Sequence, residues 1–306
     1  MNKIYIFGHK NPDTDSITSA KVMEIYCKRK GMDVEAFRLG NLNKETKYIF
    51  DYLKIEEPTL LEKVEEGQEV ILVDHNEFQQ SVDGIENSKI TMVVDHHRIA
   101  NFQTAEPLFY RAEPVGCTAT ILYKLFIEAG FEIEKLEATL MLSAIVSDSL
   151  LFKSPTCTEL DKEAALKLAK IADIDVEVYG LELLKAGTDL SDLSAEELIN
   201  VDAKEVMLKD VKAVIAQVNT ASIPDMMTRK DEIETAMNKI IEEKGLDIFF
   251  LAITDIINSN SQAIVLGNKA KLAEKSYNVN LVENTAFLEG VVSRKKQIIP
   301  ILTNNA

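Results

Sequence analysis

Cysteine is scarce in this chain, and the few cysteines that occur are far apart. Among 306 residues there are three, Cys27, Cys117 and Cys157. An odd number of widely spaced cysteines argues against a disulfide framework and fits buried thiols in a reducing cytosol. Because no two of them form a CxxC pair, a structural zinc site is not expected either.

Long apolar runs are also missing. No run approaches the roughly 20 residues that a membrane-spanning helix needs, and the run at residues 248–253 is short enough to be a buried strand. The N-terminus enters a strand-like run almost at once and has no signal-peptide pattern. We therefore expect a soluble, cytoplasmic protein with no membrane partner.

Positive charge is in short supply. The chain has 34 Lys and Arg against 50 Asp and Glu, which gives a net charge of -16. Such an acidic surface argues against binding to nucleic acid or to an anionic membrane. It does not exclude an anionic substrate, because bound metal ions can invert the local field.

What the sequence does contain is an alternation of strand and helix patterns in its first half. Continuous apolar runs predict strands buried on both faces of a parallel sheet, joined by right-handed βαβ crossovers. These strands are predicted at residues 4–7, 34–39, 70–73 and 90–94. Helices are predicted from near residue 16, and at residues 45–53, 116–129, 136–149, 158–172 and 176–185.

A polar segment at residues 187–194 contains two helix-cap candidates and marks a domain boundary. We predict a first domain at residues 1–187, a linker at 188–193 and a second, smaller α/β domain at 194–306. In the second domain, strands are predicted at 211–218, 247–254 and 262–266, and helices at 230–244 and 269–276.

The loop after the first predicted strand brings together His9, Asp13 and Asp15. Pro12 fixes the turn and favours an extended Asn11. Nitrogen and carboxylate oxygen together are a ligand set for a divalent metal such as Mn²⁺. The alternative is a loop of turn-forming residues in which Ser16 caps the following helix.

All histidines of the chain follow predicted strands of one sheet, where parallel strands end at a common edge. They are His9, His75, His96 and His97. Asp74 and Asp95 precede the last three, so carboxylates gather at the same edge. Clustered carboxylates are costly unless cations compensate them, and two divalent ions about 3.5–4 Å apart would do so.

Each of these residues also has a plainer interpretation. Asp74 could cap a helix, His75 could simply pack or hydrogen-bond in its loop, and residues 95–97 could form a turn. Asp148 lies in an apolar helix, where a carboxylate without a partner is rare. The basic residues 293–297 could be a solvated surface or a phosphate-binding site.

Six motifs together carry a family resemblance. They are GHKNPDTDS at 8–16, VDH at 73–75, VDHH at 94–97, PVGCTAT at 114–120, SD at 147–148 and SRKKQ at 293–297. In their order and spacing, these motifs resemble those of the DHH phosphoesterase superfamily and, within it, the family II manganese-dependent inorganic pyrophosphatases. The resemblance implies an N-terminal DHH-type domain, whose mainly parallel sheet is flanked by helices. It also implies a C-terminal DHHA2-type α/β domain and an active site in the cleft between the two.

The resemblance also implies roles for individual residues. One metal would be bound by His9, Asp13, Asp74 and Asp148, and the other by Asp15, Asp74, His96 and Asp148. Asp95 would orient a histidine. The catalytic residues would be Asp13, His97 and, from the second domain, Lys204, Arg294 and Lys295, which would hold the phosphates.

The reaction implied is hydrolysis of pyrophosphate to two orthophosphates by a metal-bridged hydroxide. Two Mn²⁺ per subunit, with Co²⁺ as a substitute, and a substrate-bound Mg²⁺ would be the cofactors. A homodimer, with the strand edge near Phe109 as a contact, is the expected assembly.

Three other functions compete with pyrophosphate hydrolysis: a DHH phosphodiesterase acting on oligonucleotides or cyclic dinucleotides, an exopolyphosphatase, and a non-catalytic metal or nucleotide sensor. DHH phosphodiesterases usually carry a glycine-rich, histidine-containing motif in the second domain. No histidine follows His97 here, and glycine is sparse in the second half.

Overall fold

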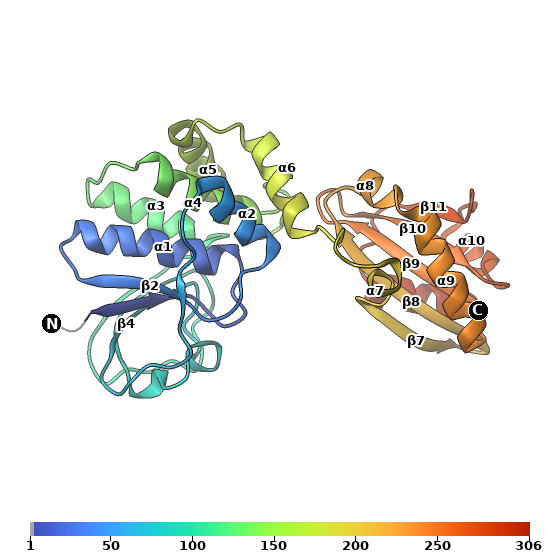
Figure 1. The fold of residues 1–306 in the computed structure, drawn as a ribbon, viewed down its shortest axis with the longest axis horizontal. Helices are drawn as coiled ribbons and strands as arrows, with labels where there is room; N and C mark the ends of the chain where they lie inside the picture. The colour runs from blue at the N-terminus through green and yellow to red at the C-terminus, as the bar shows by residue number, and fades with distance from the viewer. Residues whose placement is uncertain (1–2) are drawn as a thin grey trace. The chain divides into compact units, whose positions relative to one another are not determined.

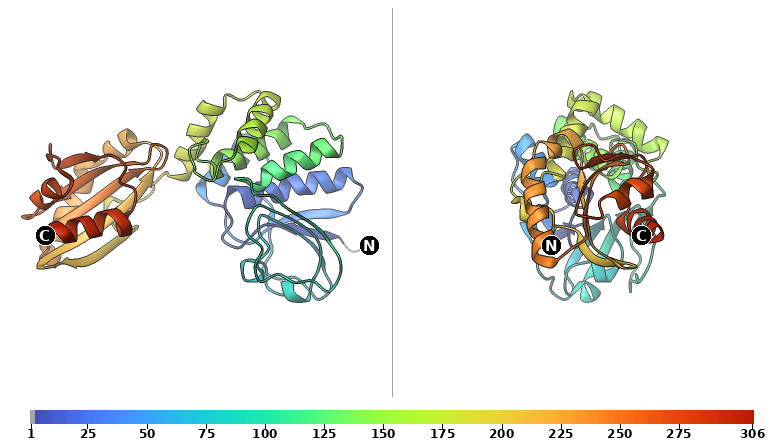
Figure 2. Two further views of the ribbon diagram at one scale, coloured as in Figure 1. Left: turned by 180° about the vertical axis from the view of Figure 1, so that it is seen from behind. Right: turned by 90° about the vertical axis from the view of Figure 1, so that its right-hand side faces the viewer.

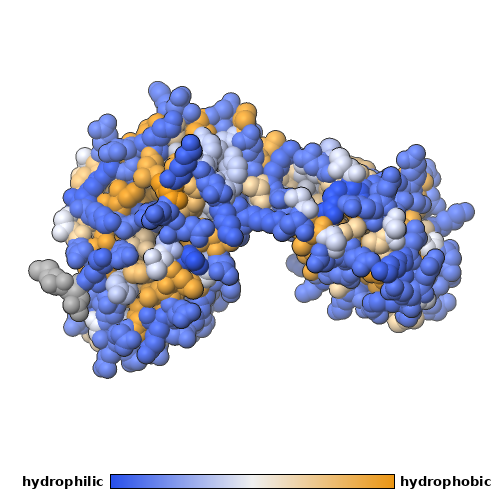
Figure 3. Space-filling model, viewed as in Figure 1, coloured by the Kyte–Doolittle hydropathy of each residue, from blue (hydrophilic) through white to orange (hydrophobic). Residues whose placement is uncertain are grey.

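The computed structural model describes residues 3–306, and their contacts divide the chain into two compact units, Met1–Gly187 and Thr188–Ala306. Each unit is α/β, as the sequence predicts. Hydrophilic residues cover most of the face seen in Figure 3. Within residues 3–306, none of the helices combines the length and apolar character that crossing a membrane requires.

The first unit contains a six-stranded sheet in the order β3-β2-β1-β4-β5-β6, with every neighbouring pair parallel. The chain winds outward in one direction from β1 to β3 and in the other from β4 to β6. The winding therefore reverses between β1 and β4, and at such a switch point the strand ends form a crevice that commonly binds ligands. The strands are β1 (Ile4–Phe7), β2 (Val34–Arg38), β3 (Thr59–Leu60), β4 (Glu69–Val73), β5 (Lys89–Asp95) and β6 (Phe109–Ala112).

Helices cover one face of this sheet (Figures 1 and 2). Helix α1 contacts β1, β2 and β4, and α3 contacts β5. Helix α4 packs against α1 and is apolar almost all round, with a run of fully buried residues. The helices of this unit are α1 (Thr14–Arg29), α2 (Lys44–Leu53), α3 (Thr118–Glu128), α4 (Lys135–Asp148), α5 (Glu159–Ala172) and α6 (Val176–Gly187).

The opposite face is covered by loops, and two of the crossovers lack the helix of a βαβ unit. The β4–β5 connection contains only the short 3₁₀ turns η1 (Phe78–Gln80) and η2 (Ile85–Asn87), and the β5–β6 connection contains no helix. Phe78 and Phe102 from these connections pack on strand residues such as Phe7 and Leu72. Their apolar residues are too sparse for a helical stripe, but they suffice to cover the sheet.

The first turn after β1 differs from the sequence prediction in two details. Helix α1 begins at Thr14 with Asp13 as its cap, whose side chain accepts a hydrogen bond from Ser16 N at 3.0 Å. Ser16 is therefore inside the helix and is not the cap. Asn11 has φ +53° and is left-handed, not extended. The chain must reverse between the end of β1 and this cap, and asparagine tolerates that conformation better than most residues.

The second unit has a five-stranded mixed sheet in the order β11-β10-β9-β8-β7, in which only β8 and β9 are parallel. Every residue of the central strand β9 is buried, which explains the uninterrupted apolar run at 248–253. Helices α7–α9 cover one face, and α10 and α11 the other. The strands are β7 (Ala203–Leu208), β8 (Val211–Thr220), β9 (Ile248–Asp255), β10 (Asn260–Leu266) and β11 (Thr285–Leu288). The helices are α7 (Ala195–Leu198), α8 (Ile223–Met227), α9 (Lys230–Lys244), α10 (Lys271–Tyr277), α11 (Ile299–Asn305) and a π-helical turn, η3 (Arg294–Ile298).

Candidate metal centre

The switch point of the first sheet collects the predicted metal ligands. His9 and Asp13 follow β1, Asp74 follows β4, and His96 follows β5. Gly8 makes the first turn tight, because a Cβ there would lie 2.0 Å from Ser16 Oγ and 2.7 Å from Ser16 O. The backbone of β1 therefore approaches α1 so closely that only glycine fits at this position.

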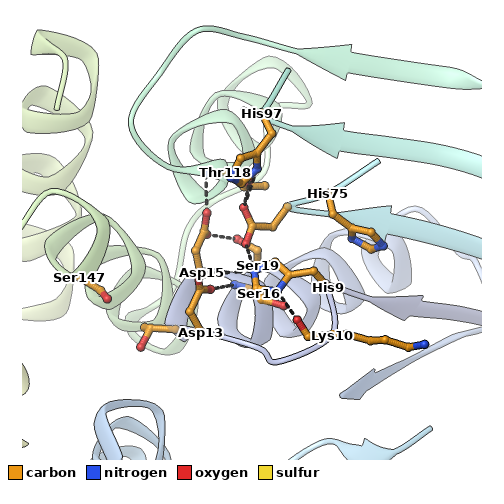
Figure 4. Close-up of polar contacts among 12 residues, drawn as sticks. His9, Lys10, Asp13, Asp15, Ser16, Ser19, His75, His97, Thr118 and Ser147 are labelled. Carbon is orange, nitrogen blue, oxygen red and sulfur yellow. Dashed lines mark hydrogen bonds and ion pairs between the residues drawn. The ribbon is translucent and has the colours of Figure 1, made fainter. Parts of the chain in front are cut away.

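Six predicted ligands form two groups whose donor atoms lie within 4.8 Å of one another. His9, Asp13 and Asp74 make one group, and Asp15, His96 and Asp148 make the other. A third group joins Asp74 and His96 to His97. An open cavity of about 440 Å³ is lined by residues of these groups, among them Asp13, Asp74, His96, His97 and Asp148. Figure 4 shows how several of these side chains converge.

The ring orientation of His9 and His96 leaves one nitrogen of each directed at carboxylates. His9 Nδ1 donates to Lys10 O at 2.8 Å, and His96 Nδ1 donates to Val115 O at 3.0 Å. Carbonyl oxygens only accept, so Nδ1 carries the proton in both rings. His9 Nε2 then lies 3.3 Å from Asp74 Oδ2, and His96 Nε2 lies 3.3 Å from Asp74 Oδ1. This is the orientation of metal-ligating histidines, whose other nitrogen bonds to the backbone.

Without a metal, these rings hold protons. Burial opposes the charge on His9, but hydrogen bonds to Asp13 and Asp74 raise its pKa to about 11. Burial likewise opposes the charge on His96, yet Asp74 and Asp15 raise its pKa to about 9. The carboxylates thus attract positive charge at the positions where the two Nε2 atoms would bind cations.

His75 is different, as its plainer interpretation anticipates. It is 1% exposed, its Nδ1 donates to Val73 O at 2.9 Å, and its Nε2 lies 3.1 Å from Ser81 Oγ. Burial lowers the pKa of His75 to about 4, so the ring is neutral and both nitrogens are used. Figure 4 shows the ring to one side of the Asp13–Asp15 group.

The buried carboxylates repel one another. Burial and the charge of Asp74 raise the pKa of Asp15 to about 7. Burial and the charges of Asp15 and Asp74 raise the pKa of Asp148 well above its usual value. For Asp74, burial also acts to raise the pKa, but hydrogen bonds with His9 and His96 hold it below its usual range.

Asp148 is the last residue of α4, and the chain after it is unusual. Leu150, Leu151 and Phe152 have φ of +47°, +54° and +67°, a left-handed run of three large side chains. Such residues adopt this conformation only at a cost, so the surrounding packing must hold it. The run stops the helix at Asp148 and leaves that carboxylate at the helix end, beside Asp15.

The start of α3, to which the sequence analysis assigned no function, supports the ligands together with Ser19 of α1. Asp15 accepts hydrogen bonds from Thr118 N at 2.6 Å, Ala119 N at 3.2 Å and Ser19 Oγ at 2.6 Å. Thr118 Oγ1 also donates to Asp74 Oδ1 at 3.1 Å. The available sequence signal was the PVGCTAT motif, which carries these groups but none of the usual metal ligands apart from cysteine.

Asp95 is hydrogen-bonded to His97 and Asn76. It is fully buried and accepts from His97 N at 3.0 Å and from His97 Nδ1 at 3.0 Å, while Asn76 Nδ2 donates to its other oxygen at 2.7 Å. The hydrogen bond with Asp95 raises the pKa of His97. Asp95 therefore orients His97, whose side chain is 53% exposed at the cavity.

This donor set fits a pair of divalent cations. Imidazole nitrogen with several carboxylate oxygens suits Mn²⁺. Asp74 Oδ2 is buried, and its contact with His9 Nε2 at 3.3 Å is longer than a good charge-assisted hydrogen bond. Asp74 shares groups with both His9 and His96, so it stands where a bridging carboxylate would be needed.

Removing bound Mn²⁺ should destabilise the protein. Metal bound to the native state alone, at 100 times its Kd, adds about 2.7 kcal/mol to the free energy of unfolding. Calorimetry with Mn²⁺ and with excess chelator should therefore show a lower Tm in chelator, by a few degrees. The Asp74→Asn variant should show a much smaller difference, and an unchanged wild-type Tm would contradict the metal centre.

The predicted phosphate-binding residues belong to the second unit. Arg294 is buried, and its guanidinium bonds to Asp202 Oδ1 at 2.8 Å and to Asp202 O. Its backbone N donates to Gln217 Oε1 at 3.0 Å. Lys204 lies on β7 and Lys295 on η3, and both are exposed. The bonds to Asp202 bring the start of β7, the strand that carries Lys204, beside Arg294.

Comparison with known proteins agrees with both units. The family model of the "DHH family, N-terminal domain" matches residues 3–145, and that of the "DHHA2 domain" matches residues 181–305. A protein of Exiguobacterium sp., named a probable manganese-dependent inorganic pyrophosphatase, is 58% identical over 307 residues, covering 100% of this chain and 99% of the relative. The manganese-dependent inorganic pyrophosphatase of Bacillus subtilis is 56% identical over 305 residues, covering 99% of each.

A crystal structure from Methanococcus jannaschii, described as a family II inorganic pyrophosphatase, matches with a TM-score of 0.62 and 41% identity over 98% of both chains. With this level of identity along its whole length, and with both domains matched, the chain belongs to the manganese-dependent family II inorganic pyrophosphatases.

Proposed function

We propose that this chain hydrolyses inorganic pyrophosphate to two orthophosphates in a manganese-dependent reaction. The observation that carries the proposal is the partly buried His–Asp donor set at the switch point, in a chain whose full-length relatives bear that activity in their names. The family resemblance carried by the sequence motifs implies the same activity.

Two Mn²⁺ ions are proposed for the centre. His9, Asp13, Asp74 and Asp148 would bind one, and Asp15, Asp74, His96 and Asp148 the other. When bound, such a pair lowers the pKa of a bridging water enough to supply hydroxide at neutral pH. Co²⁺ is a candidate substitute, because it accepts the same donors.

The chain's own residues would prepare the substrate. His97, held by Asp95 at 3.0 Å, can give a proton to the leaving phosphate. Lys204, Arg294 and Lys295 would hold the phosphate oxygens of Mg²⁺-bound pyrophosphate. Their positive charge would attract the polyanionic substrate, in a chain that is otherwise strongly acidic.

A homodimer is also proposed. Strand β6 is the edge of the first sheet, and Phe109 on it is 44% exposed. An open strand edge with an exposed aromatic side chain is a surface that a second copy can extend.

Phosphate release from three substrates tests the function. With Mn²⁺ and Mg²⁺ present, pyrophosphate should be hydrolysed at least about a hundredfold faster than polyphosphate or a dinucleotide, a difference of roughly 2.7 kcal/mol in activation free energy. Faster release from polyphosphate would indicate an exopolyphosphatase, and cleavage of the dinucleotide a phosphodiesterase. No release from any substrate, with Mn²⁺ bound, would indicate a sensor.

A further inference from the structure

Asp161 is a buried carboxylate with no role in the chemistry described so far. It has no exposed surface and is the third residue of α5. Its Oδ2 accepts from Thr158 N at 2.7 Å and from Thr158 Oγ1 at 2.6 Å, which caps the start of α5. Capping alone would explain an exposed Asp at this position, but not a fully buried one.

Two further bonds connect Asp161 to the loop before α3. Gly116 N donates to Asp161 Oδ2 at 2.8 Å, and Thr120 Oγ1 donates to Asp161 Oδ1 at 2.6 Å. The approach is close, because a Cβ on Gly116 would lie 2.8 Å from Asp161 Oδ2 and 3.0 Å from Thr156 O. One carboxylate thus holds both ends of the segment 116–120.

This segment is the one that contacts the candidate ligands. Immediately before it, Val115 O accepts from His96 Nδ1. Within it, Thr118 N and Ala119 N donate to Asp15, and Thr118 Oγ1 donates to Asp74. Residues 115–119 therefore contact two ligands of one proposed ion, Asp15 and His96, as well as Asp74, which would bridge both ions.

Helix α3 has no cap of its own that could fix this segment. Cys117 is the cap residue, and its side chain makes no capping hydrogen bond. The first amides of α3 are satisfied by Asp15, and the helix start is fixed from outside by Asp161 through Gly116 and Thr120. A shift of this start would move the donors of Asp15 and the acceptor of His96 together.

We infer that Asp161 is a positioning residue for the metal centre, acting through residues 115–120 on Asp15 and His96. The inference rests on the proposed metal centre. Groups that orient metal ligands in this way typically contribute 10- to 100-fold to metal affinity. A residue that served only to cap α5 would affect stability and leave the affinity for Mn²⁺ unchanged.

The test compares variants on the two sides of Asp161. Asp161→Ala removes both connections, and Thr120→Val removes one bond to the α3 side. Thr158→Val removes the two hydrogen bonds between the Thr158 hydroxyl and Asp161, which belong to the α5 side alone. For each full-length variant, the Kd for Mn²⁺ is measured by electron paramagnetic resonance, and the Tm in chelator reports stability without metal.

We expect Asp161→Ala to raise the Kd at least about tenfold and Thr120→Val to raise it severalfold, while Thr158→Val lowers the Tm with a Kd within twofold of wild type. If Asp161→Ala does not fold, the inference is tested by comparing the Kd for Mn²⁺ of Thr120→Val with that of Thr158→Val. A wild-type Kd in both Asp161→Ala and Thr120→Val, or an equal rise in Thr120→Val and Thr158→Val, would overturn the inference. A wild-type chain that binds no Mn²⁺ would instead refute the proposed function.

Discussion

Asp74→Asn should lower pyrophosphate hydrolysis by about 10³-fold at saturating Mn²⁺, the effect of losing roughly 4 kcal/mol of transition-state stabilisation. Asp74 is 1% exposed, and its two oxygens lie 3.3 Å from His9 Nε2 and His96 Nε2. An amide keeps the shape and removes the charge that both proposed ions would share. Steady-state phosphate release measures the loss.

The substitution should leave the fold intact, because Asp74 has φ +59° and asparagine tolerates this conformation well. Asp173→Asn is the matched control: it is the same change at φ +57°, on an exposed residue after α5. The control should keep wild-type activity, and circular dichroism should be the same for all three proteins. Near wild-type activity of Asp74→Asn would exclude a bridging role.

Lys295→Ala should have the second largest effect, a fall of about 10²-fold in kcat/KM carried mainly by a higher KM. The side chain is exposed on η3 next to Arg294, whose own guanidinium is already bonded to Asp202. Losing one charge-assisted contact to a phosphate costs roughly 2–3 kcal/mol. The Kd for Mn²⁺, whose proposed ligands all belong to the first unit, should not change.

Lys296→Ala provides the comparison for this variant, since Lys296 is the exposed neighbour on the same turn. It removes an equal charge from the same surface and should change KM by less than about twofold, because exposed charges a few residues apart act weakly at physiological salt. Equal effects of the two variants would show that only the general positive charge of this turn matters.

Much of the fold could be predicted because the buried strands are continuously apolar. The expectation for residues 4–7 agrees with β1 to the residue, and that for 70–73 falls one residue short of β4. Strand β6 was expected near Phe109 only from the family resemblance, because half-exposed Tyr110 and Arg111 carry no such pattern. Strand β7 was missed for the same reason, with only Leu208 buried. Edge strands bury too little surface to leave a clear signal.

Most candidate ligands could be named from sequence because they follow predicted strands of one sheet, and Asp148 because a carboxylate in an apolar helix needs a partner. The contacts that support these ligands could not be predicted from the sequence. Thr118 and Ala119 act on Asp15 through backbone amides, which every sequence has. Asp161 lies 45 residues from Gly116, whose backbone N it accepts from. In a sequence, an Asp that only caps its own helix cannot be distinguished from one that also bonds to a distant segment. The left-handed Asn11 is likewise set by what surrounds it.

The left-handed run after Asp148 has an electrostatic consequence. Because the run stops α4 there, Asp148 lies at the C-terminal end of the helix, where the aligned peptide dipoles are equivalent to about half a negative charge. That end of a helix repels a bare carboxylate and attracts a cation. The dipole of α4 therefore adds to the electrostatic attraction of Asp15 and Asp148 for a divalent ion. The backbone itself thus favours the metal-bound state of the proposed centre.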